Sequence, residues 1–527
     1  MTAQQTYMDA VVAAGLAPDE IIADVDELEY LSTDVYRSGD VPVAAVKPNT
    51  IEGLAAAVRI AYELQLVIVP RGGGASYSDG YVNHGQQYLL IDLRDLSSIV
   101  VNDEDATVTV GGGVTWAALK QVLDEKGWRT PFWGPFSGIV ATVGGSVSQH
   151  AVSHGSGAHG ISAPSVLGMD IVLANGEILS TGAAAANGAP GVRYAGPDLT
   201  GLFTGDCGAF GLKASVTMPL LRQKPAFRAA SFSFQDFNAL HSAMRAGALE
   251  GLDDEHFALD AALSQGQLGK EKNAARFTEV VKTVMQTHGL VGGVAQLIKM
   301  AFGGTRAIEA AEYACHYIVE GANDIEAKAK LNRLRSIMTS LGSEMSNAVP
   351  TVVRGMPFAP LFNTLGPKGE RWVPLHGIMS HTAAKEFHPA LMGFFETRAE
   401  QMKEFGIWYG TMFSSIGSSG FLYEIALYWP DVRSVYHERE IDPEYLKSLP
   451  VYEENEAARV YVDKLKKDLI ALYRECHASF FQIGRAYPYK DLLNSPAANL
   501  LETIKATLDE KSLMNKGVLG LGVKNNN

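Results

Sequence analysis

Short apolar runs alternate with segments of helical periodicity over residues 41–221. The runs VAAVKP and LVIVP predict buried strands, and TIEGLAAAVRIAYEL between them predicts an amphipathic helix that begins at Asn49 or Thr50. The strands QYLLIDL and ATVTVGGGV follow, and TWAALKQVLDEKG predicts a helix that ends at its glycine. Farther on, ANGE predicts a hairpin turn between two apolar strands. This alternation is typical of a mixed α/β domain.

A different pattern begins near Pro219 and Pro225, where we expect a domain boundary. Beyond it, residues 307–340 predict one long helix, GFLYEIALYW predicts a strand, and residues 455–475 and 496–509 predict two more helices. We therefore expect an α+β chain of four segments. They are a helical lead-in at 1–37, a first domain at 38–222, a second α+β domain at 223–480 and a C-terminal segment at 481–527.

Length, charge and cysteine content narrow the class of protein. At 527 residues the chain is too long for one ordinary core, so two domains are expected. A net charge of -14 argues against sequence-independent nucleic-acid binding, which requires basic patches. The three cysteines lie far apart in the sequence, which argues against a disulfide framework and favours a reducing, cytoplasmic setting. The sequence shows no secretory signal and no apolar stretch long enough to cross a membrane.

Three glycine-rich segments carry the candidate chemistry. They are PRGGGASY at 70–77, PFSGIVATVGGS at 135–146 with its continuation SHGSGAHG at 153–160, and TGDCGAFG at 204–211. In the first, three glycines allow the backbone to turn its N–H groups to one side, which makes a nest for a pyrophosphate; a plain glycine turn is the alternative. None has the spacing of a Rossmann or P-loop fingerprint, so a nicotinamide or ATP fold is not supported.

The order and spacing of these segments resemble the vanillyl-alcohol oxidase/para-cresol methylhydroxylase (PCMH-type) flavoprotein superfamily. The matching stretches are PRGGGASYSD, GGGVTWAALKQVLDEKGW, ATVGGSVSQ, LGMDIVLANGEILSTG, GLFTGDCGAFGLKASVTMPL and IKATLDEKSLMNKGVLGLG. The resemblance implies a two-subdomain FAD-binding domain over 38–222, an α+β cap domain that covers the substrate over 223–480, and a tail that returns to the FAD domain. Within the superfamily, GGSVSQHAVSHGSGAHG is nearer to the 4-alkylphenol oxidase branch than to the lactate and glycolate branch.

The resemblance also implies which residues contact FAD. The first segment is expected to hold the pyrophosphate, the second to lie along the flavin, and the third to contact the adenine end. The implied contacts are Pro70, Arg71, Gly72, Gly73, Gly74, Ala75, Ser76, Tyr77, Pro135, Gly138, Ala141, Thr142, Gly144, Gly145, Ser148, His154, Gly155, Gly208, Gly211 and Leu212. Some relatives attach FAD covalently through a cap-domain His or Tyr. The resemblance places Tyr423 near that position, with an ordinary packed strand tyrosine as the alternative.

The tail carries a candidate substrate anchor. The phenol-oxidising branch has a Tyr-Arg pair that binds a phenolate, and this chain has Gly484 and Arg485 there. Tyr487 and Tyr489 follow closely and are candidates to replace the missing tyrosine. The resemblance therefore implies that Arg485 and Tyr487 hold a substrate anion or a flavin oxygen. A surface ion pair is the alternative for Arg485.

A histidine is the candidate base. Phenol oxidases of this branch carry an aspartate near the flavin, where this chain has Ser153 or His154. We expect His154 to take a proton from the substrate, because imidazole titrates near neutral pH. His150 and His159 lie in the same loop and are alternatives, and purely structural hydrogen bonds are the remaining interpretation.

These features predict an FAD-dependent oxidoreductase that transfers hydride from an aromatic, phenolic or other alcohol to flavin N5. A 2-hydroxy-acid or sugar-lactone dehydrogenase on the same fold is one alternative, and a flavin-binding protein without catalysis is another. We expect no metal, because His376, His381 and His388 are not spaced to share one helix face. The expected partners are a small organic substrate, O2 or a carrier protein as electron acceptor, and a second copy of the chain in a homodimer.

Overall fold

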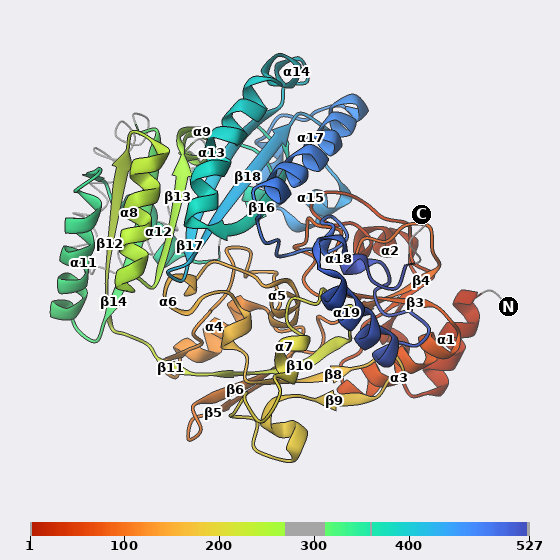
Figure 1. Ribbon diagram of the computed structural model, residues 1–527. Coiled ribbons are helices and arrows are strands. Elements are labelled where there is room, and N and C mark those ends of the chain that lie inside the picture. The colour runs from red at the N-terminus through yellow and green to blue at the C-terminus, as the bar shows by residue number, and fades with distance from the viewer. Residues whose placement is uncertain (1–2, 269–310, 359–360, 524–527) are drawn as a thin grey trace.

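The computed structural model describes residues 3–268, 311–358 and 361–523. The chain forms two lobes. An N-terminal lobe contains strands β1 to β11, and a cap lobe contains strands β12 to β18 (Figure 1). Helices and strands are mixed in both lobes, which confirms the predicted α+β fold class.

The first sheet of the N-terminal lobe is built from the predicted apolar runs. Its order is β1-β2-β4-β3, and the bounds are Ile21–Ile22, Ala44–Val46, Tyr88–Asp92 and Val67–Arg71. Helices α1 (Ala3–Ala13) and α3 (Ile51–Glu63) cover one face, and α2 (Val25–Leu31) covers the other. The segment 1–37, expected to be a helical lead-in followed by acidic helix or loop, contains α1 and α2, and between them the short strand β1 pairs antiparallel with β2. Two isoleucines are too short a run to show a strand period in the sequence.

The second sheet is antiparallel and has the order β5-β6-β10-β8-β9. Its strands span Ile99–Asn102, Thr107–Gly111, Leu212–Pro219, Gly168–Val172 and Ile178–Ser180. Strands β8 and β9 form the hairpin predicted around ANGE. Nearby lie helices and a two-stranded ribbon: α4 (Trp116–Asp124), α5 (Val143–Gln149), α6 (Ser156–His159), α7 (Leu199–Leu202), β7 (Trp128–Arg129) and β11 (Leu221–Arg222).

The cap lobe is organised around a seven-stranded sheet of order β15-β12-β14-β13-β17-β18-β16. In that order its strands span Ser343–Met345, Ala226–Phe234, Tyr313–Gly321, Glu255–Asp260, Trp408–Ile416, Gly420–Trp429 and Arg371–Ser380. The prediction of one helix over 307–340 is wrong for its described part, which forms strand β14 and then helix α11 (Asp324–Met338). Because β14 lies in the middle of the sheet with its residues almost all buried, it lacks the alternation that marks a strand in sequence. Residues 307–310 lie outside the described residues.

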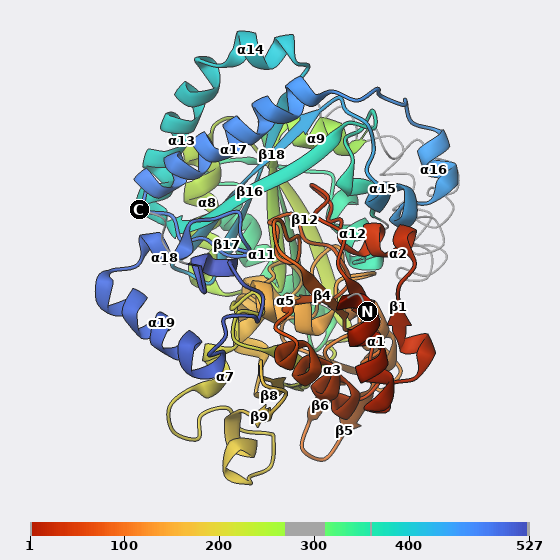
Figure 2. The ribbon, with the colours of Figure 1, turned by 90° about the vertical axis from the view of Figure 1, so that its right-hand side faces the viewer.

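Helices cover the outer face of the cap sheet and leave its inner face to the N-terminal lobe. The outer layer contains α8 (Phe237–Glu250), α11, α13 (His381–Glu396) and α17 (Glu456–Glu475) (Figures 1 and 2). Helices α9 (Ala261–Leu268) and α12 (Ala348–Gly355) flank the inner face. The other described helices are α14 (Ala399–Glu404), α15 (Val435–Glu440), α16 (Pro443–Lys447), α18 (Tyr489–Leu492), α19 (Ser495–Leu508) and the 3-10 turns η1 (Pro18–Glu20), η2 (Ala163–Ser165), η3 (Gly182–Ala186), η5 (Leu361–Thr364) and η6 (Val518–Gly520).

The end of the described chain lies against the N-terminal lobe. Met514 forms a parallel bridge with Ile68 of β3. The Lys505 ammonium donates to the carbonyl oxygens of Ala209 and Met514, both at 2.7 Å. These contacts place the C-terminal segment beside the glycine-rich loops, although the two are far apart in the sequence.

Candidate functional site

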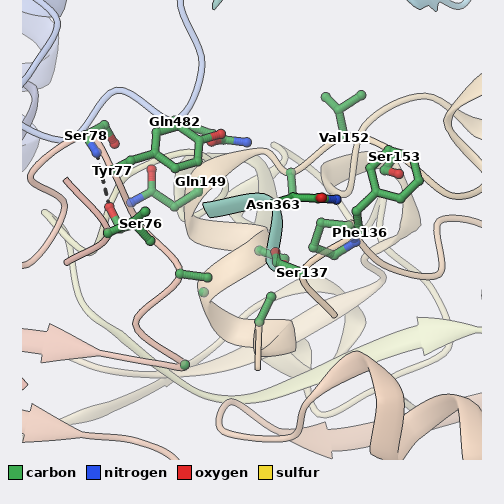
Figure 3. A pocket seen from close by; sticks show the side chains of 18 of the residues that line it. Ser76, Tyr77, Ser78, Phe136, Ser137, Gln149, Val152, Ser153, Asn363 and Gln482 are labelled. Carbon is green, nitrogen blue, oxygen red and sulfur yellow. Dashed lines mark hydrogen bonds between the residues drawn. The ribbon is translucent and has the colours of Figure 1, made fainter. Parts of the chain in front are cut away.

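A cavity of about 480 Å³ lies between the two lobes. Loops after β3, around α5 and before β10 line it from the N-terminal lobe, and β13, β14, β16, β17, β18, α9 and α12 line it from the cap. Figure 3 shows side chains from both sides meeting there, with Tyr77, Gln149 and Gln482 near one another and Phe136 and Ser153 farther along. The volume is in the range of ligand sites, and the junction of two lobes is where such sites commonly occur.

The loop after β3 presents free backbone donors to this cavity. Within the described ranges, the N–H groups of residues 72–77 donate no hydrogen bond to the protein. Gly74 has φ +75°, which favours glycine, and the buried Arg71 guanidinium packs directly beneath it. Unsatisfied N–H groups above a buried cation fit a diphosphate, so this loop suits the pyrophosphate of a dinucleotide.

Gly73 is required because it packs closely against another backbone segment. A glycine in an anion-binding loop is instead expected to be required for its positive φ. The φ of Gly73 is not in the left-handed region, but a Cβ there would lie 1.7 Å from the carbonyl oxygen of Val140. The loop therefore packs backbone against backbone on the second glycine-rich segment. Thr142 of that segment caps α5 by accepting a hydrogen bond from the Gly145 N–H, and both residues line the cavity.

Most of the expected FAD contacts line the cavity. They are Pro70, Gly72, Gly73, Gly74, Ala75, Ser76, Tyr77, Pro135, Ala141, Thr142, Gly144, Gly145, Ser148, Gly208, Gly211 and Leu212. Four others do not line it: Arg71, Gly138, His154 and Gly155. Gly138 and Gly155 pack instead against Phe358 and the Pro131 carbonyl, respectively.

His154, the expected base, is fully buried beside the cavity instead of lining it. Its Nε2–H donates to the Pro357 carbonyl at 2.8 Å, and its Nδ1 contacts the Glu255 carboxylate. Its ring stacks on Trp133 at 4.5 Å between centroids. Glu255 itself lines the cavity, and its Oε1 is buried with no hydrogen-bond partner in the described residues. The histidine is thus placed to orient a carboxylate that faces the cavity.

Arg485 and Tyr487 also lie outside the cavity lining. The Arg485 guanidinium donates to the carbonyl oxygens of Asp79 and Lys516, both at 2.9 Å, and burial lowers its pKa to about 10. The Tyr487 hydroxyl accepts from the His376 N–H at 3.2 Å. Both side chains tie the C-terminal segment to the rest of the protein.

Tyr423 lies on the face of β18 that points away from the cavity. Successive strand residues point to opposite faces, so Leu422 and Glu424 line the cavity while Tyr423 packs toward the outer helices. Its hydroxyl lies 2.9 Å from His388 Nδ1 of α13. Tyr423 is therefore an ordinary packed strand tyrosine, which was the alternative interpretation, and does not lie beside the cavity where a covalently held flavin was expected.

Glu424 is one of the titratable side chains in the cavity lining that sequence reasoning missed, together with Glu255, His256 and His316. Burial raises its pKa to about 7, although its side chain keeps 17% of its surface exposed. Its Oε2 lies 3.9 Å from Nδ1 of His376, whose Nε2–H donates to the Phe481 carbonyl. Burial lowers the His376 pKa to about 4, so this imidazole is neutral near pH 7. The strand GFLYEIALYW could have revealed this residue, because residues two apart in a strand share one face and Glu424 therefore shares its face with Leu422 and Ala426.

Tyr77 faces Glu424 from the N-terminal lobe side of the cavity. Its ring packs edge-on against Trp372 at 5.5 Å and His376 at 5.8 Å. Burial raises the Tyr77 pKa well above its usual value, the Glu424 charge raises it further, and a hydrogen bond with Gln482 opposes both. A neutral phenol and an amide thus hydrogen-bond in the cavity lining, within electrostatic range of the Glu424 carboxyl.

The remaining cap wall is mostly apolar. Its aliphatic and aromatic members include Phe257, Leu259, Leu263, Val349, Val352, Val353, Met356, Trp372, Met412, Leu422 and Tyr428. His256 is fixed by Asp253 at 2.6 Å and by the Ser415 N–H at 2.7 Å. Lys213, on the opposite wall, forms a buried ion pair with Asp206. The cap therefore offers an apolar surface with few polar groups.

The described residues contain neither a metal-binding cluster nor a membrane-spanning helix. No group of three or more His, Cys, Asp and Glu side chains in the described ranges is placed to hold a metal ion. His376 lies on β16, His381 contacts His241 at 3.1 Å, and His388 contacts Tyr423. No described helix is both long enough and apolar enough to span a membrane.

Comparison with known proteins agrees with this geometry. Residues 42–182 match the family model described as an FAD binding domain. The chain is 28% identical over 192 residues to glycolate oxidase subunit GlcD of Bacillus subtilis (strain 168), covering 36% of this chain and 39% of that protein. The chain thus spans about two fifths of the length of this curated relative.

Solved structures extend the similarity to nearly the whole chain. A structure of p-cresol methylhydroxylase with substrate bound has a TM-score of 0.69 and 14% identity, over 98% of this chain and 97% of that one. The 4-ethylphenol oxidase from Gulosibacter chungangensis in complex with isoeugenol has a TM-score of 0.67 and 14% identity, with the same coverage. Residues 42–182 therefore form an FAD-binding domain, and the chain has the same fold as the solved structures of p-cresol methylhydroxylase and 4-ethylphenol oxidase.

Proposed function

We propose that this protein is an FAD-dependent oxidoreductase that oxidises a small, largely apolar alcohol or phenol in the cavity between its lobes. The observation that carries the proposal is the joint lining of this one cavity. Glycine-rich loops with free N–H groups form one side, and an apolar cap wall with Glu424 forms the other. A dinucleotide on the first side would leave the cap side for the substrate.

The glycine-rich loops supply the FAD site in this proposal. Residues 72–77 would hold the pyrophosphate, residues 141–148 would lie along the flavin, and Gly208, Gly211 and Leu212 would contact the adenine end. FAD supplies the hydride acceptor when it is bound. The protein supplies orientation, exclusion of water and management of the substrate proton.

Tyr77, Gln482 and Glu424 are the residues to which we assign the substrate hydroxyl. The Tyr77 phenol and the Gln482 amide, which both line the cavity, would hydrogen-bond it. Glu424 would accept its proton, because a carboxyl with a pKa of about 7 is half ionised near neutral pH and so balances availability against basicity. We assign Glu255, oriented by His154, to a positioning role farther along the wall.

The charge of the cavity favours a neutral or phenolic substrate over a 2-hydroxy acid. A carboxylate substrate needs a cation, and the Lys213 ammonium in the lining is already held by Asp206. Desolvation lowers the pKa of His316 in the lining to about 3, which keeps that ring neutral. The aromatic and aliphatic cap wall instead suits a hydrocarbon ring.

Anaerobic mixing of the FAD-loaded protein with a substrate panel tests this proposal. p-Cresol, 4-ethylphenol and benzyl alcohol are compared with glycolate and D-lactate, and flavin bleaching is followed by absorbance. Bleaching by the aromatic members supports the proposal. Bleaching by the hydroxy acids alone supports the dehydrogenase alternative, and a protein that no reductive substrate bleaches supports a flavin-binding role. Peroxide detection in air then distinguishes O2 from a carrier protein as acceptor.

We further propose a cytoplasmic homodimer. All three cysteines are unpaired, which fits a reducing compartment. Cell fractionation checks the compartment, and light scattering of the purified protein checks the oligomeric state.

A further inference from the structure

Strand pairing places His376 directly beside the cavity-lining Glu424. The two residues are opposite each other in the antiparallel pair of β16 and β18, and cross-strand partners have their side chains on the same face of the sheet. Glu424 lines the cavity and its side chain keeps 17% of its surface exposed, whereas His376 is completely buried. The imidazole therefore meets the carboxyl from inside the protein, away from the space that a substrate would occupy.

The surroundings of His376 determine which ring nitrogen carries its hydrogen. Nε2 lies 3.2 Å from the Phe481 carbonyl oxygen, which only accepts hydrogen bonds, so Nε2 is the donor. Burial lowers the His376 pKa to about 4, so the ring is neutral near pH 7 and has no second N–H. Nδ1 is therefore an acceptor.

This acceptor is unsatisfied. Nδ1 of His376 is buried from water and has no hydrogen-bond partner in the described ranges, which is a costly state for a polar atom. The Glu424 Oε2 atom lies 3.9 Å from it, which is too long for a hydrogen bond. Two acceptors have no hydrogen to share, so an ionised Glu424 gains nothing by approaching. A protonated Glu424 has an O–H that can close the gap.

No other basic group in the described part of the chain lies within ion-pair distance of Glu424. The other titratable groups within electrostatic range of this carboxyl are tyrosines. They are Tyr77 of the loop after β3, Tyr428 of β18, Tyr473 of α17 and Tyr487 of the C-terminal segment. Burial raises the pKa of each tyrosine above its usual value, so all four are neutral near pH 7.

From this geometry we infer that His376 is a positioning residue, whose Nδ1 accepts a hydrogen bond from Glu424 once that carboxyl holds the substrate proton. The inference rests on the proposed function, which assigns the proton to Glu424. In this step the substrate O–H bond breaks, its electron pair stays on the substrate oxygen, and the proton bonds to a Glu424 oxygen. The new O–H turns to His376, so the proton is held away from the substrate. This hydrogen bond favours the neutral carboxyl and adds to the effect of burial on the Glu424 pKa.

Two variants each keep one half of the histidine. His376→Gln keeps a donor near the position of Nε2 for the Phe481 carbonyl and removes the acceptor at Nδ1. His376→Asn keeps an acceptor near the position of Nδ1 and removes the donor. His84→Gln makes the same change as the first variant at an exposed histidine and is its control.

Infrared titration of the FAD-loaded full chain measures the protonation of Glu424 without any substrate. Subtracting the spectrum of Glu424→Gln identifies the carbonyl stretch of the protonated Glu424 carboxyl. His376→Gln should lower the midpoint of this titration by about one pH unit, the scale of one hydrogen bond, and should move the band to higher frequency. His376→Asn and His84→Gln should keep the midpoint and the band of the wild type.

A wild-type midpoint in His376→Gln would overturn the inference, because the histidine would then serve only to anchor the Phe481 carbonyl. Equal shifts in His376→Gln and His376→Asn would overturn it as well, since a general disturbance of the strand would explain both. The wild type alone gives a further test if a variant does not fold. A Glu424 band at the frequency of a carboxyl without a hydrogen bond would contradict the assignment.

Failure of the proposed function is distinguishable from failure of this inference. A protein that no substrate bleaches would refute the proposed function, while the infrared titration would still report on the pair of Glu424 and His376. If both hold, the pH dependence of flavin reduction in His376→Gln should shift by the same amount as the infrared midpoint.

Discussion

Replacing Glu424 with glutamine is the most informative single change in the proposed mechanism. The substitution keeps the shape of the side chain and removes its ability to take a proton. Burial raises the pKa of this carboxyl from 4.5 to about 7. That rise corresponds to roughly 3 kcal/mol against the ionised form in the folded protein.

The kinetic consequence follows from the need for the ionised form. If Glu424 accepts the substrate proton, the limiting rate of flavin reduction in the wild type should rise with pH through about 7. Glu424→Gln should lower this rate by ~10²-fold or more and should remove this pH dependence. Anaerobic stopped-flow measurement between pH 5.5 and 8.5, with buffers chosen around the pKa of about 7, is the assay. Glu444→Gln, the same chemical change at an exposed site, should behave as wild type.

The same pKa shift makes a separate prediction about stability. The folded protein holds the Glu424 proton more tightly than the unfolded chain, so stability from this group is present below pH 4.5 and falls as pH rises to about 7. Glutamine does not titrate, so its contribution does not change with pH. The free energy of unfolding of Glu424→Gln, relative to that of the wild type, should therefore be roughly 3 kcal/mol higher above that window than at low pH.

The kinetic assignment has its own refutation. A wild-type rate of flavin reduction that does not depend on pH, together with an unchanged rate in Glu424→Gln, would refute the assignment of Glu424 as the proton acceptor.

Four further predictions concern the cofactor and the tail. Denaturation should release FAD and no FMN, as chromatography of the supernatant would show, and Tyr423→Phe should not change the fraction released, because Tyr423 faces away from the cavity. Gly73→Val should lose both FAD absorbance and thermal stability, since its Cβ would overlap the Val140 carbonyl, whereas Gly393→Val, with open space around it, should retain FAD. Arg485→Ala should cost about 2–4 kcal/mol of stability by leaving buried carbonyls unpaired, without changing substrate affinity in rapid-mixing titrations. Arg485→Ala with normal melting and weakened substrate binding would restore its expected role as an anchor.

Local sequence was enough to predict those helices and strands whose hydrophobic pattern and capping residue both lie within one short stretch of the chain. Thr50, one of the two expected caps, caps α3, and the apolar runs of the N-terminal lobe form its first sheet. The long helix expected over 307–340 failed where β14 begins, because a strand buried on both faces has no alternation to distinguish it from a buried helix. Its position in the middle of a seven-stranded sheet is a property of distant partners, β12 and β13.

The candidate site shows the same division. The sequence alone identified the glycine-rich loops, because φ > 0 and close backbone approach restrict the residue type locally, and most of the expected FAD contacts do line the cavity. Side-chain direction was decided only by tertiary packing. His154, Arg485 and Tyr487 lie near the cavity but point to Glu255, to the loop at Asp79 and to His376, respectively. Glu424, which does line the cavity, acquires its raised pKa from burial between two lobes, which no local pattern encodes.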